Sequence, residues 1–153
     1  MTKDNVQKLG GVLRTLDRIM LTTLDQSGHL VSRPMALRVD TFDGSLVLFA
    51  PIDSRVIANI RADPKVNISY TGSTTSLSVA GKATFSPNRD RVAARWHPGL
   101  DSWFPGGPKG VAVIEVAVEE ARIWSVTEQE HSPSPMQSGM RQVDAADLAR
   151  QRA

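Results

Sequence analysis

The sequence predicts a mainly β fold, a small antiparallel barrel with helical additions. Six segments of strand length are apolar or alternate between apolar and polar residues, and short turns join them. Three further segments carry apolar residues at helical spacing. The 153 residues show no internal repeat and suffice for one domain with a sizeable core. Together these features favour an α+β protein built on one small barrel.

The elements follow one another in a simple order. Helices are predicted over residues 6–16, 53–62 and 87–96. Strands are predicted over residues 19–24, 29–39, 45–50, 66–71, 75–85 and 111–124. A loop rich in glycine and proline, residues 97–110, precedes the last strand. We therefore expect a domain over residues 1–125 and a C-terminal extension over 126–153, which either packs on a partner subunit or stays mobile.

Turn residues mark the ends of the first strands. Gly28 can take positive φ in the turn at 25–28, and Asp43-Gly44 is typical of a β-hairpin. Pro34 lies inside the second strand, where it cannot donate to a ladder. It therefore indicates an edge strand, a bulge, or a place where a ligand replaces a neighbouring strand.

An apolar strand runs directly into a helix between Leu48 and Arg61, with Ser54 and Arg55 at the junction. The N-terminus of a helix presents unpaired N–H groups and the positive end of the dipole, so an anion is stabilised there. Arginine adds a partner that suits phosphate. The alternative is that Asp53 or Ser54 only caps the helix and Arg55 is solvated.

Three segments give the chain its resemblance to a known family: the strand-to-helix junction at Ser54 and Arg55, and two others. The two others are Arg33-Pro34-Met35 in the second strand and the Trp-Phe-Pro-Gly-Gly loop that begins at Trp103. In this order the three segments resemble the flavin-binding split-barrel superfamily. Within it, the chain is most similar to the pyridoxamine 5′-phosphate oxidase-like proteins called general stress protein 26. The resemblance covers about Leu13 to Trp124 and implies a six-stranded antiparallel split β-barrel with flanking helices.

The resemblance also implies a flavin mononucleotide (FMN) site. Ser54 and Arg55 would bind the phosphate, and Arg33 would lie close to the phosphate or the pyrimidine ring. The cofactor-binding residues that it implies are Arg33, Pro34, Met35, Ala36, Phe49, Ala50, Ser54, Arg55 and Trp103. No catalytic acid or base and no metal ligand is identified.

Two positions depart from the family's pattern. Ala50 stands where threonine is usual, and Val56 stands where lysine is usual. A charge-assisted hydrogen bond contributes roughly 1.5–3 kcal/mol. Loss of the lysine is therefore expected to weaken FMN by about one to two decades.

Composition excludes several classes of protein. The net charge is only +2 and the basic residues form no cluster, so no nucleic-acid partner is expected. There are no cysteines, and the three histidines are far apart, which argues against disulfides and zinc sites. No apolar run approaches the roughly 18 residues of a membrane span, and no signal peptide is evident. A cytoplasmic protein is expected.

The expected function is an FMN-dependent oxidoreductase step on a small molecule, with a nicotinamide as candidate electron donor. The resemblance implies a homodimer with C₂ symmetry and FMN at the subunit interface. Oxidation of pyridoxamine phosphate itself is not expected, because the family's substrate-binding Arg and His signature is not visible near the C-terminus. Two alternatives stay open: a flavin-binding or flavin-free stress or sensor protein without turnover, and the same fold binding a deazaflavin or haem.

Overall fold

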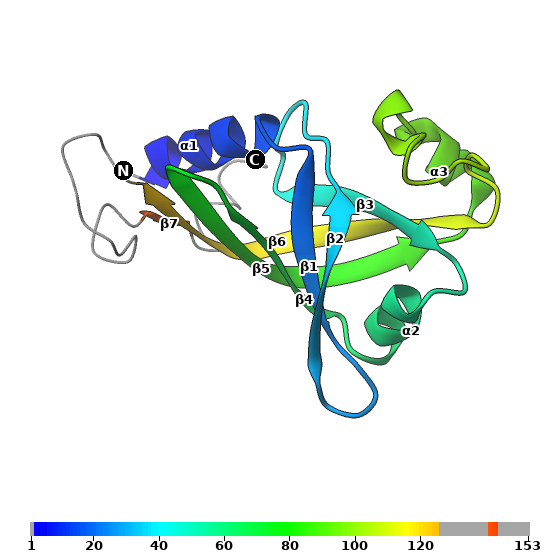
Figure 1. Ribbon diagram of the computed structural model, residues 1–153. Coiled ribbons are helices and arrows are strands. Elements are labelled where there is room, and N and C mark those ends of the chain that lie inside the picture. Colours follow the sequence, from blue (N-terminus) through cyan, green and yellow to red (C-terminus); the bar gives the residue numbers. More distant parts are fainter. Residues whose placement is uncertain (1, 126–140, 144–153) are drawn as a thin grey trace.

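An antiparallel sheet that curls into a half-barrel organises the chain (Figure 1). The computed structural model describes residues 2–125 and 141–143. The strands are β1 (Arg18–Leu24), β2 (Leu30–Ala36), β3 (Ser45–Pro51), β4 (Lys65–Thr71), β5 (Thr75–Ser86), β6 (Val111–Ser125) and β7 (Arg141–Val143). Their order is β2-β1-β4-β5-β6-β3, with the short β7 beside β6. The predicted mainly β half-barrel with six long strands is confirmed.

The two ends of the strand order are β2 and β3. Pro34 therefore lies on an edge strand, one of the three alternatives that its missing N–H left open. The hairpin predicted from Asp43-Gly44 is wrong, because β3 pairs with β6 and not with β2. Gly44 does take positive φ, at 103°, and its carbonyl accepts from the Val118 N–H at 3.0 Å. Asp43 and Gly44 determine only the local turn, whereas the strand that pairs with β3 is determined by residues far away in the sequence.

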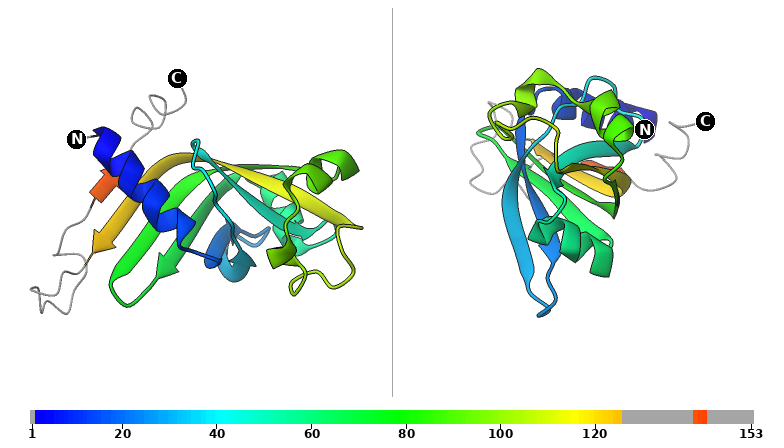
Figure 2. Two further views of the ribbon diagram at one scale, coloured as in Figure 1. Left: turned by 90° about the horizontal axis from the view of Figure 1, so that it is seen from above. Right: turned by 90° about the vertical axis from the view of Figure 1, so that its right-hand side faces the viewer.

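Three helices flank the sheet: α1 (Thr2–Arg14), α2 (Arg55–Ala62) and α3 (Arg89–Arg95). All three were predicted, with α1 running on through Gly10 and Gly11. Figure 2 shows α1 lying across one end of the sheet and α3 lying near the other. None of the helices in the part of the chain that the structure describes is long and apolar enough to cross a bilayer.

The apolar interior falls into two clusters. The main cluster fills the curl of the sheet, where Leu9 and Leu13 of α1 and Ile57 and Ile60 of α2 pack on inward-facing strand residues. The second cluster lies among β3, β6, α3 and the loop that begins at the 3₁₀ turn η1 (Pro98–Leu100). The buried members of the second cluster are Ala36, Phe49, Val92, Leu100 and Val111.

The predicted C-terminal extension is described only at β7. There Gln142 pairs with Arg122 of β6 in the same chain. Residues 126–140 and 144–153 lie outside the described part of the chain, so the prediction for them stays a prediction.

Candidate functional site

The start of α2 lacks the hydrogen bonds that usually close a helix N-terminus. Ser54 occupies the capping position with extended backbone, but its side chain makes no capping bond. The first helical bond runs from the Ala58 N–H to the Ser54 carbonyl at 3.2 Å. The N–H groups of the three residues before Ala58, which are Arg55, Val56 and Ile57, find no acceptor among the described residues. They point out of the helix start as free donors.

The Ser54 hydroxyl is also left without a partner. Its Oγ is buried and makes no hydrogen bond within the described structure. A buried polar group without a partner costs roughly 1–3 kcal/mol, and such groups are rare. A ligand atom that bonded both Oγ and the free N–H groups would remove this cost. Among the described residues, the start of α2 therefore has hydrogen-bonding groups that no other group of the chain satisfies.

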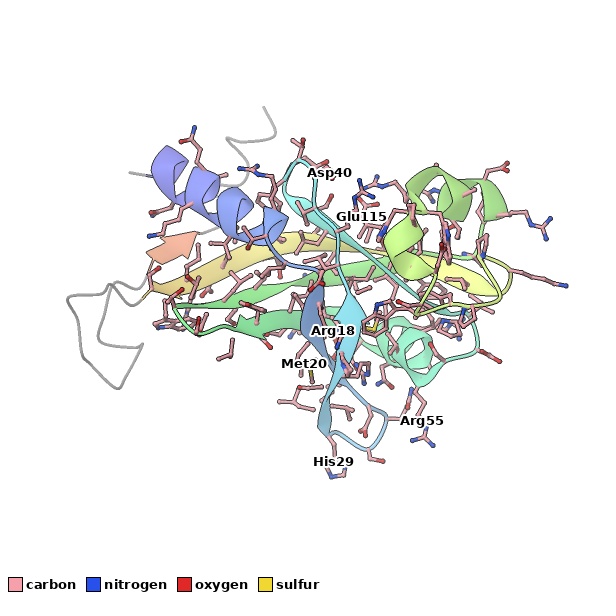
Figure 3. The ribbon with its side chains drawn as sticks, turned by 45° about the horizontal axis from the view of Figure 1, so that its top comes forward. Arg18, Met20, His29, Asp40, Arg55 and Glu115 are labelled. Carbon is pink, nitrogen blue, oxygen red and sulfur yellow. The ribbon has the colours of Figure 1, made fainter. Side chains whose placement is uncertain are left out.

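One cationic side chain, that of Arg55, lies at this helix start. Arg55, the first residue of α2, is exposed and extends on the side of the β1–β2 hairpin, whose tip carries His29 (Figure 3). No ion pair involves Arg55 within residues 2–125. The first turn of α2 contains no acidic residue, although the exposed Asp53 precedes it. The guanidinium and the helix dipole thus favour an anion here.

Arg33 reaches the same helix through a buried polar contact. Its Nη1 donates to Thr23 Oγ1 at 2.9 Å and to the Leu21 carbonyl at 3.3 Å. Thr23 Oγ1 also accepts from Asn59 Nδ2 at 2.9 Å, so the contact joins β2, β1 and α2. Desolvation lowers the pKa of the half-buried Arg33 below its ordinary value, yet a guanidinium stays charged at neutral pH. No carboxylate in the described part of the chain pairs with it.

This contact ties Arg33 to the helix that begins at Ser54 and Arg55. Asn59 follows Arg55 by four residues, so both lie on one face of α2, roughly 6 Å apart along the axis. The structure thus connects Arg33 to α2 through Thr23 and Asn59, one helical turn from Arg55. The grouping of Arg33, Ser54 and Arg55 around one phosphate stays a prediction.

The other residues that the sequence predicted to bind the cofactor lie in the two apolar clusters or on the surface of β2. Met35 and Ala50 are buried in the main cluster, and Pro34 is exposed on the outer face of β2. Ala36 and Phe49 are buried in the second cluster, against which Trp103 packs. Their assignment to a cofactor stays a prediction.

The second cluster is held by aromatic contacts. The Phe49 ring meets Trp96 edge to face with centroids 5.5 Å apart. The Arg18 guanidinium lies 5.2 Å from the Trp103 ring centroid. The first contact packs β3 against the end of α3, and the second packs β1 against the loop that follows η1. This packing is a sufficient structural role for Phe49 and Trp103.

Both departures from the family's pattern are buried in the main cluster. Val56 is 7% exposed and Ala50 is 3% exposed. A lysine at position 56 would be packed among apolar side chains unless its stem reached the helix start. The polar side chains at the helix start are therefore those of Asp53, Ser54 and Arg55.

Sequence reasoning missed Thr23 and Asn59. Both are buried, at 1% and 2% exposure. Thr23 continues the inward-facing alternation of Ile19 and Leu21, and Asn59 interrupts the apolar face of α2 between Ile57 and Ile60. A polar residue at a position that the pattern assigns to the core was the available signal.

A second polar region lies on the far side of β3. A cavity of about 330 Å³ is lined by Arg38, Asp40, Arg95 and His97, among others. Desolvation, followed by the charge of Arg38, lowers the pKa of His97 below its ordinary value. The buried Nδ1 of His97 has no hydrogen-bond partner in the described part of the chain. Across residues 2–125 and 141–143, no group of three or more His, Cys, Asp or Glu side chains is arranged to hold a metal ion.

Comparison with protein families gives one match over most of the chain. The family model described as "Pyridoxamine 5'-phosphate oxidase like" matches residues 4–142. A curated relative, Protein bli-3 of Neurospora crassa, is 35% identical over 108 residues. That alignment covers 68% of this chain and 51% of the relative, so the matched part is about half of that protein.

Solved structures share the fold at low sequence identity. A Clostridium acetobutylicum protein related to general stress protein 26 has a TM-score of 0.76 at 11% identity and covers 95% of this chain and 98% of its own. The general stress FMN/FAD binding protein of Xanthomonas citri has a TM-score of 0.67 at 22% identity, covering 86% and 96%. A heme binding protein of Mycobacterium smegmatis has a TM-score of 0.67 at 15% identity, covering 98% and 60%.

Proposed function

The chain belongs to the pyridoxamine 5′-phosphate oxidase-like family, and from this premise we propose that it binds FMN with the phosphate at the start of α2. The observation that carries the proposal is the buried Ser54 Oγ without a hydrogen-bond partner beside the free N–H groups of the first turn. Phosphate oxygens accept hydrogen bonds from both kinds of donor. The flavin-binding structural relative from Xanthomonas citri supports the choice of ligand.

The charges near the helix start fit a phosphate monoester. Arg55 would contact the phosphate from the solvent side, and Arg33 would contribute a second positive charge from the interior of the sheet. Arg33 uses only Nη1 for the hydrogen bonds that the structure describes, so its other nitrogens have no acceptor in residues 2–125. Two arginines without carboxylate partners can therefore compensate a dianion.

We also propose a C₂ homodimer that covers the β1–β2 hairpin. This hairpin projects from the body of the molecule (Figure 1) and carries the exposed large apolar residues Met20, Leu30 and Val31. Pro34 lies opposite Met20, and Leu30 shares this face, whereas Val31, opposite Thr23, lies on the other face of the hairpin. An apolar surface at a sheet edge favours association. Because the hairpin lies beside α2, a partner there would also enclose the proposed FMN site.

Light scattering tests the assembly. The expected mass at micromolar protein is twice that of the 16.6 kDa chain. Leu30→Lys places a charge on a side chain that is 76% exposed, so the monomer fold should be unaffected while the dimer weakens. A wild-type mass of one chain would overturn the homodimer.

Bound FMN supplies reversible redox chemistry, and the activity that we propose is flavin-dependent reduction or oxidation of a small molecule, with a nicotinamide as candidate donor. The chain's own residues bind and orient the flavin. The structural similarity to a heme binding protein favours haem as the second candidate ligand. A deazaflavin and a non-catalytic flavin-binding or flavin-free stress or sensor protein are further candidates.

The visible spectrum of the purified protein, before and after incubation with FMN and removal of free ligand, separates the candidate ligands, and turnover of a nicotinamide donor separates an enzyme from a non-catalytic flavin-binding protein. Flavin absorption bands retained with the protein are the expected result. A Soret band would favour haem. Absence of any retained chromophore, together with no binding of added FMN, would contradict the proposal and favour the flavin-free protein.

A further inference from the structure

We propose that Thr23 and Asn59 are positioning residues that hold the Arg33 guanidinium in place for the FMN phosphate. This inference rests on the FMN site proposed above. It assigns a role to two buried polar residues that bind no ligand themselves. Each residue comes from a different element, Thr23 from β1 and Asn59 from α2, and together they fix a side chain of β2.

The geometry makes Thr23 the centre of the arrangement. Its Oγ1 accepts from Arg33 Nη1 and from Asn59 Nδ2, both at 2.9 Å. A hydroxyl oxygen has two lone pairs, so both are used. The Asn59 amide therefore restricts where the Thr23 hydroxyl can turn, and the hydroxyl in turn restricts Arg33. The Leu21 carbonyl, opposite Arg33 in the β1–β2 register, adds a second acceptor at 3.3 Å.

The acceptors around Arg33 are neutral. A carboxylate would hold the guanidinium equally well, but it would cancel the positive charge and compete with an incoming phosphate. A hydroxyl and a carbonyl hold the guanidinium and leave its full charge available. This choice of acceptors suits an arginine that binds an anion better than an arginine that serves only to fill space.

Core packing alone does not require this arrangement. Thr23 and Asn59 are almost fully buried, and their neighbours Leu21, Ile57 and Ile60 belong to the main apolar cluster. Apolar residues of similar shape at both positions would pack without any hydrogen-bond requirement. The buried polar pair is explained if it fixes Arg33, because a side chain already held in place loses less conformational freedom on binding.

A double-mutant cycle on FMN affinity tests the inference. Thr23→Val removes the acceptor while keeping the shape, and Arg33→Met removes the guanidinium. Thr23→Val is expected to weaken FMN by roughly threefold to tenfold, the effect of mobilising one side chain, and to leave riboflavin unchanged. In the Arg33→Met background the same change should have no further effect. Thr23→Ser, which keeps the hydroxyl, should bind FMN like the wild type.

A second measurement needs no ligand. Nitrogen-15 NMR of the arginine side chains reports how fast the Arg33 guanidinium turns and exchanges its protons. In Thr23→Val these rates should rise, and in Thr23→Ser they should not. Asn59→Leu should raise them as well; if that variant fails to fold, the Thr23 variants still decide the question.

The outcomes separate the two proposals. Wild-type protein that does not bind FMN would overturn the proposed function and this inference with it. Wild-type binding together with additive effects of Thr23→Val and Arg33→Met would overturn this inference alone. Equal losses for FMN and riboflavin in Thr23→Val, or unchanged Arg33 rates, would also overturn it, because the contact would then be structural only.

Discussion

Helices α2 and α3 begin in different ways, although both start with an arginine after a polar capping residue. At α3, Asn88 Oδ1 accepts from the Asp90 and Arg91 N–H groups, both at 3.0 Å. Asp90 also places an acidic side chain in the first turn. At α2, the Ser54 side chain makes no capping bond, and its buried Oγ has no partner among residues 2–125 and 141–143. The first turn of α2 contains no acidic residue.

The difference indicates which helix start is complete within its own chain. The start of α3 pairs two of its free N–H groups with the Asn88 side chain and complements its dipole with Asp90. Among the described residues, the start of α2 has no side-chain capping bond and no acidic residue in its first turn, and its first residue is the cation Arg55. A helix start that the protein does not satisfy itself is the place where an anion contributes most. The comparison therefore points to α2 as the ligand site.

The largest difference in FMN affinity is expected between the variants Arg55→Ala and Arg89→Ala. Each change removes one exposed guanidinium from the first position of a helix, so the loss of charge is matched. Arg55→Ala should weaken FMN by about tenfold or more, since a charge-assisted bond contributes roughly 1.5–3 kcal/mol. Arg89→Ala should change FMN affinity by less than about twofold. Fluorescence titration with FMN measures both.

Riboflavin, which lacks the phosphate, is the control for Arg55. Its affinity should be nearly the same in Arg55→Ala and in the wild type. Equal losses for both ligands would mean that Arg55 acts on the structure. No loss for either would make Arg55 a solvated surface residue.

A smaller contrast is expected between the capping residues. Asn88→Ala removes two capping bonds and should lower the free energy of unfolding by about 1 kcal/mol. Ser54→Ala removes a hydroxyl that has no partner, so the unfolding free energy of the ligand-free protein should fall by much less or rise. Urea denaturation measures both.

For FMN affinity, in contrast to stability, Ser54→Ala should have a larger effect than Asn88→Ala. Ser54→Ala should weaken FMN by roughly fivefold, a hydrogen bond of about 1 kcal/mol, and Asn88→Ala should leave FMN affinity unchanged. If Ser54→Ala were as destabilising as Asn88→Ala in the ligand-free protein, the two helix starts would be equivalent and the comparison would fail.

The smallest effect is expected from salt. Raising the ionic strength from about 0.1 M to 1 M shortens the Debye length from about 10 Å to 3 Å. The exposed Arg55 should therefore contribute less, and wild-type FMN affinity should fall a few-fold while that of Arg55→Ala changes little. An identical salt response in the two proteins would show that Arg55 does not face the phosphate.

The fold could be predicted from sequence as far as its signals are local. Alternation along the strands and the apolar faces of α1 and α2 depend on neighbouring residues, and these elements are confirmed. Pro34 limited its position to an edge strand, a bulge or a place where a ligand replaces a neighbour, because its missing N–H is a property of one residue, and the structure shows the edge strand. The hairpin predicted from Asp43-Gly44 was wrong because strand pairing depends on segments far apart in the sequence, and β3 pairs with β6.

The same distinction applies to the candidate site. Ser54 and Arg55 are adjacent at a strand-to-helix junction, so the sequence could nominate them. Thr23 and Asn59 are 36 residues apart and meet only in the fold. The burial of Phe49 against Trp96 follows from which face of β3 it occupies, and the sequence could not determine that α3 covers this face.

Titration of the wild-type protein with FMN and with riboflavin tests the central claim most directly. The two ligands share the ring and differ in the phosphate that the start of α2 is proposed to bind. At about 0.1 M salt, FMN should bind at least tenfold more tightly, because the phosphate gains charge-assisted bonds from Ser54, Arg55 and Arg33. Equal affinities for FMN and riboflavin would contradict the account.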